Sequence, residues 1–179
     1  MTLRGPIRTE SLQIGEHTYF AYDFSLLTWF PGERIVIGKY CSIAAGVVIC
    51  TGGMRRTDTA ALYPFDVARA YRTTRNTKIG NDVWIGYGAM VVNGAQVGDG
   101  AIVASGSNVF SDVPPFAVVA GNPAQVLRYR FSKPVVARLL RIAWWNWPDA
   151  EVTANIDWFY RPINEFVDRF DPQREAPDE

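Results

Sequence analysis

The side chains best suited to acid–base and nucleophilic chemistry are few in this chain. The sequence contains one histidine, His17, and two cysteines, Cys41 and Cys50. No histidine partner marks either thiol as a nucleophile, so both are expected to be small buried apolar side chains. One histidine and two separated cysteines also make no cluster of metal ligands. The sequence therefore predicts neither thiol catalysis nor a metal site.

A polar, basic and aromatic segment, residues 51–78, holds the other side chains that could do chemistry. It begins TGGMRRTD and continues into ALYPF, which places Arg55, Arg56, Asp58 and Tyr63 close together in sequence. An arginine keeps its proton near neutral pH because its pKa lies above about 12, so it cannot act as a general base. Its guanidinium can instead clamp a carboxylate or phosphate, or stabilise the oxyanion of a thioester.

A six-residue repeat must position these side chains. From residue 79 the chain reads IGNDVW, IGYGAM, VVNGAQ, VGDGAI, VASGSN and VFSDVP, and earlier blocks with the same spacing start at Ile37 and Ile14. A period of six fits short strands separated by tight turns, which glycine favours. The pattern predicts an all-β fold, a parallel β-helix in which three hexads close one triangular coil. A β-sandwich is the less favoured alternative, because its strands are not spaced at six.

The repeat is interrupted twice and is followed by helical spacing. Residues 1–131 are predicted to form the β-helix domain, with insertion loops at 21–34 and 51–78. Long loops on a rigid scaffold usually carry function. Residues 132–170 are predicted to be helices that pack on the β-helix, because their apolar residues recur at helical spacing. Residues 171–179 are charged and contain proline, and we expect a disordered tail.

Composition excludes several classes of partner. The chain has 179 residues, 18 of them Lys or Arg and 18 Asp or Glu. This balance argues against a general electrostatic grip on nucleic acid or an anionic membrane surface. No window approaches the ~20 apolar residues of a membrane span, and the N-terminus has no apolar signal region. We therefore expect a soluble, cytoplasmic protein with no nucleic-acid and no membrane partner.

Three segments together resemble a known family. They are GNDVWIGYGAMVVNGAQVGDGAIVASGSNV, GNPAQVLRYRF and the WWNW helix, and the resemblance covers roughly residues 10–160. They are similar to the hexapeptide-repeat xenobiotic acetyltransferases, which include chloramphenicol- and streptogramin-type O-acetyltransferases and relatives that modify sugars. The resemblance implies a left-handed parallel β-helix with a C-terminal helical segment, a homotrimer, and acetyl-CoA as co-substrate in a groove between neighbouring β-helices. The small-molecule acceptor then meets the donor beneath the long loop of the adjacent chain.

The resemblance also implies roles for individual residues. Trp84 matches the tryptophan beside the pantetheine arm and the thioester, and Arg128 matches a basic position near the CoA phosphates. Backbone groups at Ser105 and Phe110 are implied to line the CoA groove, and Asn122 and Pro123 to lie near the adenine. The implied acceptor contacts are Tyr19, Tyr22, Asp23 and Tyr63.

One position departs from the family pattern. Arg55 stands where the family carries the catalytic histidine that takes a proton from the acceptor hydroxyl. A hydroxyl acceptor would lose base catalysis that is typically worth about 10²–10⁴-fold. Three hypotheses follow: the chain acetylates an amine, which needs no deprotonation by the enzyme; another residue, His17 or Asp58, is the base; or catalysis is lost and the chain binds a ligand or a partner.

Overall fold

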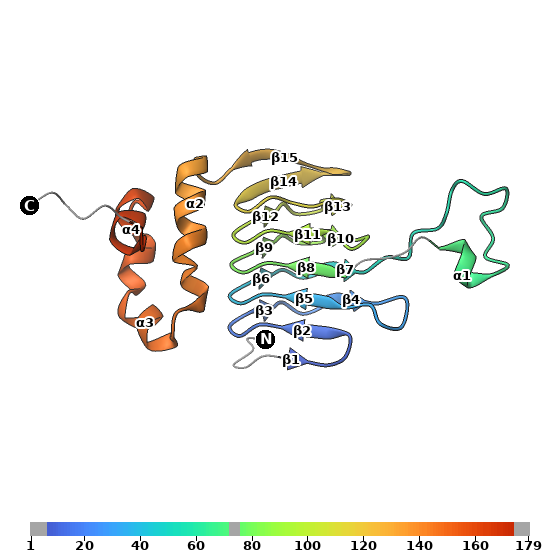
Figure 1. Cartoon of the computed structure of the whole chain (residues 1–179), viewed down its shortest axis with the longest axis horizontal. Helices are drawn as coiled ribbons and strands as arrows, with labels where there is room; N and C mark the ends of the chain where they lie inside the picture. Colours follow the sequence, from blue (N-terminus) through green and yellow to red (C-terminus); the bar gives the residue numbers. More distant parts are fainter. Residues whose placement is uncertain (1–6, 72–75, 174–179) are drawn as a thin grey trace, which may run out of the picture. The chain divides into compact units, whose positions relative to one another are not determined.

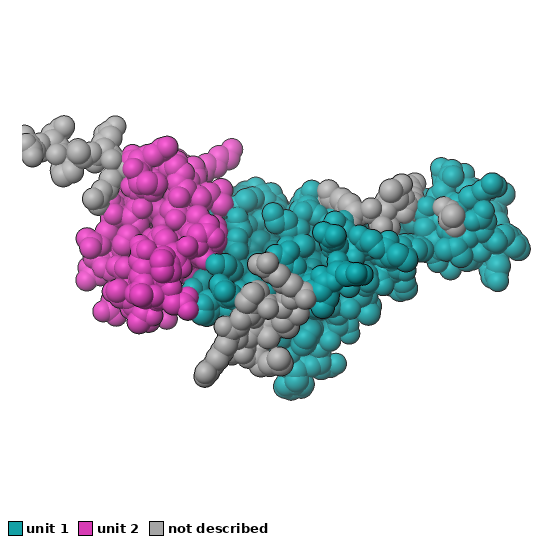
Figure 2. All heavy atoms as spheres, turned by 60° about the horizontal axis from the view of Figure 1, so that its bottom comes forward, with its two compact units in different colours: residues 1–129 teal, residues 130–179 magenta. Residues whose placement is uncertain are grey.

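The computed structural model describes residues 7–71 and 76–173, which form two compact units. Figure 2 draws the two units, residues 1–129 and 130–179, in separate colours. The boundary at 129/130 lies two residues before the predicted boundary. The expectation that the second unit packs on the first stays a prediction. In the part of the chain that the structure describes, no helix is long and apolar enough to cross a membrane.

The first unit is a three-sided coil of short strands, in which each turn of the coil adds one strand to each side (Figure 1). One side is a five-stranded sheet of β1 (Ile7–Arg8), β2 (Leu12–Ile14), β5 (Ile35–Ile37), β8 (Thr77–Ile79) and β11 (Gln96–Val97). The next is a six-stranded sheet of β3 (Tyr19–Phe20), β6 (Ser42–Ile43), β9 (Trp84–Ile85), β12 (Ile102–Val103), β14 (Ala117–Gly121) and β15 (Ala124–Tyr129). The third is a four-stranded sheet of β4 (Ser25–Leu27), β7 (Val48–Cys50), β10 (Met90–Val91) and β13 (Asn108–Val109).

The period of six arises from this geometry. From residue 79 onward, the strands of the hexads point β-branched residues into the coil, and successive turns stack these residues in parallel register. All six residues that open the hexads are at most 2% exposed: Ile79, Ile85, Val91, Val97, Val103 and Val109. Their burial removes apolar surface from water along the whole coil axis. The predicted parallel β-helix is confirmed.

Glycine is required where successive turns of the coil approach closely. A Cβ added to Gly38 would lie 2.4 Å from the carbonyl oxygen of Gly80, and one added to Gly80 would lie 2.6 Å from Oδ1 of Asp99. Any side chain there would push the turns apart, since 2.4 Å is well inside van der Waals contact. The glycine that follows the aliphatic residue of a hexad therefore allows successive turns of the coil to stack closely.

The two insertions differ in extent from the prediction. Residues 21–34 were predicted to be one insertion loop, but they contain β4, which pairs in parallel with β7. Only residues 28–34 leave the coil here, because Leu26 follows the inward spacing of the third side. The long segment between β7 and β8 includes the short helix α1 (Val67–Ala70) and projects from the coil (Figure 1).

The second unit is helical and carries a cluster of aromatic rings. Its elements are α2 (Lys133–Ile142), η1 (Trp144–Asn146), α3 (Asp149–Ala154), η2 (Ile156–Tyr160) and α4 (Ile163–Phe170). The ring of Trp147 contacts Phe159, Phe166 and Phe170, with centroids 5.0–6.2 Å apart. The WWNW segment is thus a packing element of this unit, as the burial of Trp145 also indicates.

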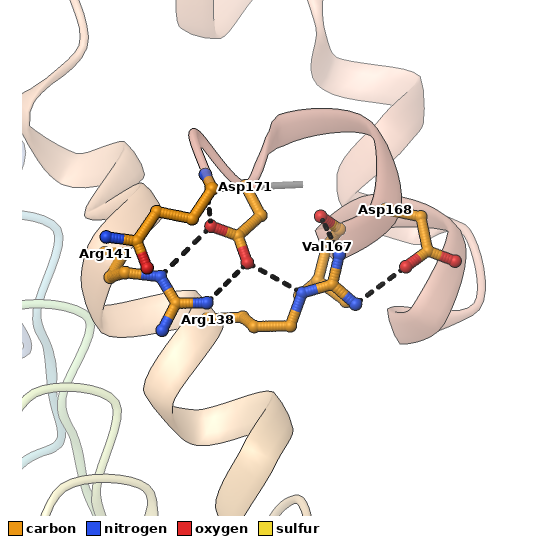
Figure 3. A network of polar contacts seen from close by, with 6 residues as sticks. Arg138, Arg141, Val167, Asp168 and Asp171 are labelled. Atoms are coloured by element: carbon orange, nitrogen blue, oxygen red, sulfur yellow. Dashed lines mark hydrogen bonds and ion pairs between the residues drawn. The ribbon is translucent and has the colours of Figure 1, made fainter. Parts of the chain in front are cut away.

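The first residue of the predicted tail, Asp171, is not disordered. Asp171 was placed in that tail, but it is 3% exposed and its carboxylate pairs with Arg138 and Arg141 of α2 (Figure 3). Two guanidinium groups compensate the cost of burying this charge. Residues 174–179 lie outside the described residues.

Candidate functional site

One row of outward-facing residues crosses the six-stranded sheet and contains three of the predicted site residues. In strand register the row runs Tyr19, Ser42, Trp84, Ile102, Val118, Arg128. Trp84 is 55% exposed and Tyr19 is 46% exposed, whereas their strand neighbours Ile85 and Phe20 are buried. With strands about 4.8 Å apart, Trp84 lies roughly 10 Å from Tyr19 and roughly 14 Å from Arg128 along the row. We call these six residues the outer row.

Five further predicted residues lie in turns that follow strands of the same sheet. Tyr22 and Asp23 follow β3, Ser105 follows β12, and Asn122 and Pro123 join β14 to β15. Ser105 stacks over Gly86, where an added Cβ would lie 2.6 Å from the Ser105 backbone nitrogen. Tyr22 is 85% exposed. The structure therefore brings these residues, which were predicted to contact the donor or the acceptor, to one side of the coil and one of its corners.

Phe110 is placed on a different side. It directly follows β13 of the four-stranded sheet and is 43% exposed. Within one chain it does not share a sheet with Trp84 and Arg128. Its predicted place in the same CoA groove then requires the four-stranded side of one coil to face the six-stranded side of another.

Arg55 lies near the base of the long insertion and is held there by its own loop. Its Nη1 donates a hydrogen bond to the carbonyl oxygen of Leu62 at 2.6 Å. Its backbone pairs with that of Tyr71, and its guanidinium carbon lies 5.6 Å from the centre of the Tyr71 ring. A guanidinium has five N–H donors, so further donors remain for an anionic or carbonyl oxygen.

Asp58 is engaged by the neighbouring arginine. Both of its oxygens accept hydrogen bonds from Arg56, Oδ1 from Nε and Oδ2 from Nη2, each at 3.1 Å. This bidentate pairing raises the pKa of Arg56 above its usual value. The carboxylate of Asp58 therefore faces a cation, and both of its oxygens are engaged by one guanidinium.

The tip of the insertion presents aromatic side chains to solvent. Tyr63 is 69% exposed and meets Phe65 edge-on, with ring centroids 4.9 Å apart. Leu62 and Met54 are also exposed. Aromatic and apolar surface of this kind suits a ring-containing acceptor.

His17 occupies a corner of the coil away from the insertion. It sits between β2 and β3 with φ 62°, and its ring stacks on that of Tyr40, with centroids 4.6 Å apart. The insertion instead leaves the corner between β7 and β8. The two positions lie at opposite ends of the strands of the five-stranded sheet, so one chain does not bring His17 to Arg55.

The cysteines are buried and unsuited to nucleophilic chemistry. Cys41 is fully buried, and its Sγ donates to the carbonyl oxygen of Gly80 at 3.1 Å. Burial raises the pKa of Cys41 to about 12, so the thiolate is scarce at neutral pH. Within residues 7–71 and 76–173, no group of three His, Cys, Asp or Glu side chains is placed to hold a metal ion.

Residues at the base of the insertion were not singled out from the sequence. Glu33, Thr51 and Tyr71 connect the two insertions, as described below. The sequence offers only a weak indication of their role. Glu33 is an acidic residue at the end of an aromatic segment, two residues before the inward-facing Ile35. Its partner Thr51 is 18 residues away, which no local pattern reveals.

Comparisons with known proteins agree with the repeat and the fold. Residues 76–111 match the sequence model of the bacterial transferase hexapeptide, six repeats. A chloramphenicol acetyltransferase of Agrobacterium fabrum is 34% identical over 176 residues, covering 86% of this chain and 84% of that protein. A probable macrolide acetyltransferase of Lysinibacillus sphaericus is 38% identical, covering 72% of this chain and 78% of that protein.

The solved structures give the same assignment. The hexapeptide-repeat acetyltransferase VCA0836 of Vibrio cholerae superposes with a TM-score of 0.55 and 28% identity, over 68% of this chain and 64% of that chain. The fold is the left-handed parallel β-helix of such enzymes. With the repeat, the fold and the two acetyltransferase relatives in agreement, the chain belongs to the hexapeptide-repeat xenobiotic acetyltransferase family.

Proposed function

We propose that this protein transfers an acetyl group from acetyl-CoA to a small acceptor without a histidine base, and that it acts on an amine in preference to a hydroxyl. The observation that carries the proposal is the hydrogen bond that Arg55 donates to the carbonyl of Leu62, at a loop position that the resemblance assigns to the family histidine. A side chain that donates there and keeps its proton at neutral pH cannot accept one from a hydroxyl.

The outer row supplies the donor side of the site. The exposed indole of Trp84 is proposed to lie along the pantetheine arm, close to the thioester. Arg128, three strands away, is proposed to pair with a CoA phosphate, for which a guanidinium is well suited. The Asn122–Pro123 turn and the backbone at Ser105 and Phe110 are proposed to complete the donor site.

The reaction proceeds by direct attack. The lone pair of a neutral amine forms a bond to the thioester carbonyl carbon, and the carbonyl becomes an oxyanion that a guanidinium can stabilise. The C–S bond then breaks, CoA leaves as the thiolate, and the amine proton passes to the thiolate or to solvent. Binding contributes proximity, which is worth about 7–11 kcal/mol at best.

The other two hypotheses receive less support. The ring of His17 stacks on that of Tyr40, and both oxygens of Asp58 accept hydrogen bonds from Arg56, so each of the two side chains is already engaged by a neighbour. A protein without catalysis is the remaining alternative. If it bound no donor, such a protein would have no evident use for an exposed tryptophan and an exposed arginine in register on one sheet, as Trp84 and Arg128 are.

Calorimetric titration of acetyl-CoA, with desulfo-CoA as a control, tests the donor site first. We expect micromolar binding with one molecule per chain, followed by CoA release when amino sugars and other amines are screened. Lack of binding up to millimolar acetyl-CoA would exclude the acetyl-transfer proposal. Tight binding with no turnover on any amine or hydroxyl would favour the non-catalytic alternative.

A further inference from the structure

A buried carboxylate lies where both insertions leave the coil. Glu33 is 7% exposed, and its Oε2 accepts hydrogen bonds from the backbone N–H groups of Trp29, at 2.7 Å, and Phe30, at 3.0 Å. The same oxygen accepts a hydrogen bond from the hydroxyl of Thr51, the fully buried residue at which the long insertion begins. A carboxylate can be buried only when such donors compensate for lost water. Glu33 thus ties the 28–34 turn to the first stem of the insertion.

The second stem of the insertion is tied to the same turn. The backbone nitrogen of Arg34 donates to Oδ1 of Asn76 at 2.8 Å. In return, the backbone nitrogen of Thr77 donates to the carbonyl of Arg34 at 3.1 Å. The turn that contains Glu33 therefore fixes both ends of the long insertion.

A continuous set of contacts leads from this turn to Arg55. The Trp29 indole packs against Gly53, where an added Cβ would lie 2.8 Å from Nε1. The Phe30 ring meets Tyr71 edge-on, with centroids 5.1 Å apart. Tyr71 is in turn the residue that pairs with the Arg55 backbone and lies under its guanidinium. Displacement of the turn would therefore move the loop that presents Arg55.

We infer that Glu33 is a positioning residue for acyl transfer: through Thr51, Trp29 and Phe30 it fixes the loop that carries Arg55. The kinetic part of this inference rests on the proposed function. Misplacement of a reacting partner by about 1 Å can cost about 10²-fold in rate. Displacement of this loop should not change the binding of acetyl-CoA, because the outer row lies on the six-stranded sheet, which the insertion does not join.

The variant Thr51→Val tests the positioning role of Glu33. It is preferred to Glu33→Ala, because loss of the carboxylate would leave three hydrogen-bond donors unpaired. We expect kcat/KM for the acceptor to fall by about 10- to 100-fold and KM for acetyl-CoA to stay within about twofold. Thr51→Ser keeps the hydroxyl and should restore the acceptor kinetics. Hydrogen exchange of the Arg56 amide, which donates to the carbonyl of Ala70 at 2.9 Å, should accelerate in Thr51→Val.

Thr18→Val is the matched control. Thr18 is fully buried too, and its hydroxyl donates to the carbonyl of Gly38 at 2.7 Å and accepts from the Cys41 amide at 3.0 Å. It lies in another corner of the coil, so its loss should leave acceptor kinetics and Arg56 exchange as in the unmodified protein.

Two results would overturn the inference: equal changes in Thr51→Val and Thr18→Val, or no recovery in Thr51→Ser. If the unmodified protein turns over no acceptor, the proposed function fails instead. Hydrogen exchange of the Arg56 amide then still tests the structural part of the inference. Faster exchange in Thr51→Val alone would mean that Glu33 fixes the loop, and unchanged exchange would mean that the loop is held independently of Glu33.

Discussion

At the scale of single residues, the proposed choice of acceptor depends on the side chain at position 55. Arg55 donates to Leu62 and lies over Tyr71, and both contacts use the arginine as a cation and hydrogen-bond donor. A hydroxyl acceptor needs a group that accepts its proton during attack, whereas a neutral amine does not. If an arginine replaces the family histidine, as the resemblance implies, we expect the class of acceptor to change and the donor side to stay the same.

Arg55→His should consequently raise activity on hydroxyl acceptors by about 10²-fold, near the lower end of what a positioned general base contributes. CoA release with matched hydroxyl and amine acceptors measures the change. Arg55→Gln is the control, because it loses the same guanidinium contacts but adds no base, and it should show no gain. An unchanged rate with a hydroxyl acceptor that demonstrably binds would mean that Arg55 does not point where a base must stand.

Single residues of the site differ in how far the sequence reveals them. Trp84 and Arg128 lie in segments that resemble the family, and the hexad phase also places Trp84 on the outer surface. Glu33 could not be found this way, because its partner is 18 residues distant and its burial depends on how two insertions fold together. A sequence motif or a repeat period predicts residues at recurring positions. It does not predict a contact that forms only once in the fold, such as that between Glu33 and Thr51.

Strand β9 shows how adjacent residues of one element separate stability from binding. Ile85 is fully buried between Ile43 and Val103 of neighbouring strands, while Trp84 points outward and is 55% exposed. Ile85→Ala should lower the free energy of unfolding by roughly 2–5 kcal/mol, since it leaves a cavity in a stacked core.

Trp84→Ala should have the complementary effect. It removes an exposed side chain, so the unfolding free energy should change by about 0.5 kcal/mol or less. Acetyl-CoA binding should weaken by about tenfold or more, as for an aromatic anchor of a binding site. Denaturant unfolding and calorimetric titration of both variants measure the contrast, and an Ile85→Ala protein of undiminished stability would contradict the assignment of inward and outward positions.

A salt-bridge network that was not predicted from the sequence joins helix α2 to Asp171, the residue that follows α4. The carboxylate of Asp171 accepts hydrogen bonds from Arg138, at 2.8 Å, and from Arg141, at 2.6 Å (Figure 3). These arginines, Arg141 first, hold the pKa of Asp171 well below its usual range. A charged, proline-containing end of chain predicts disorder by composition, yet two cations one helical turn apart on α2 are enough to order Asp171.

Asp171→Asn should therefore lower the melting temperature by several degrees at neutral pH. A carboxyl whose folded pKa is depressed contributes stability above its unfolded pKa of about 3.9 and loses it as pH falls toward the folded pKa. The difference between variant and unmodified protein should thus shrink below about pH 4. Asp168→Asn is the control: Asp168 also pairs with Arg138 at 2.7 Å but is 68% exposed, and such surface pairs contribute little. An equal loss of melting temperature in the two variants, or a loss that does not depend on pH, would contradict this role of the Asp171 salt bridges.

The regular part of the β-helix was predictable and its departures were not. The hexads from residue 79 define inward positions, strand phase and turns, because one coil geometry repeats them. β4 was missed because Ser25–Leu27 stands alone between an aromatic turn and Pro31-Gly32, with only one turn of the coil on which to align it. A repeat predicts an element through its copies, so the first turn of a coil is the hardest to assign.

The topology of the first unit places the long insertion and the outer row on different parts of the coil. The chain passes from the five-stranded to the six-stranded and then to the four-stranded side in every turn, and the long insertion leaves between β7 and β8. That corner is opposite the six-stranded side, which carries the outer row. Because a corner and the opposite side of one coil face away from each other, Arg55 and Trp84 of one chain do not face a common acceptor. We therefore propose that the insertion of one chain meets the outer row of another, in the homotrimer that the family resemblance implies.

Mixing two defective chains tests this arrangement. The first chain carries Trp84→Ala and Arg128→Ala and lacks the donor side. The second is shortened between Arg56 and Ala70, whose backbones are already joined by a hydrogen bond of 2.9 Å, and lacks the insertion tip. Each alone should release almost no CoA. Co-expressed in equal amounts and randomly assembled, about a quarter of the sites should pair an intact insertion with an intact outer row. Activity near a quarter of that of the unmodified protein is expected; co-assembled chains that remain inactive would place the whole site within a single chain.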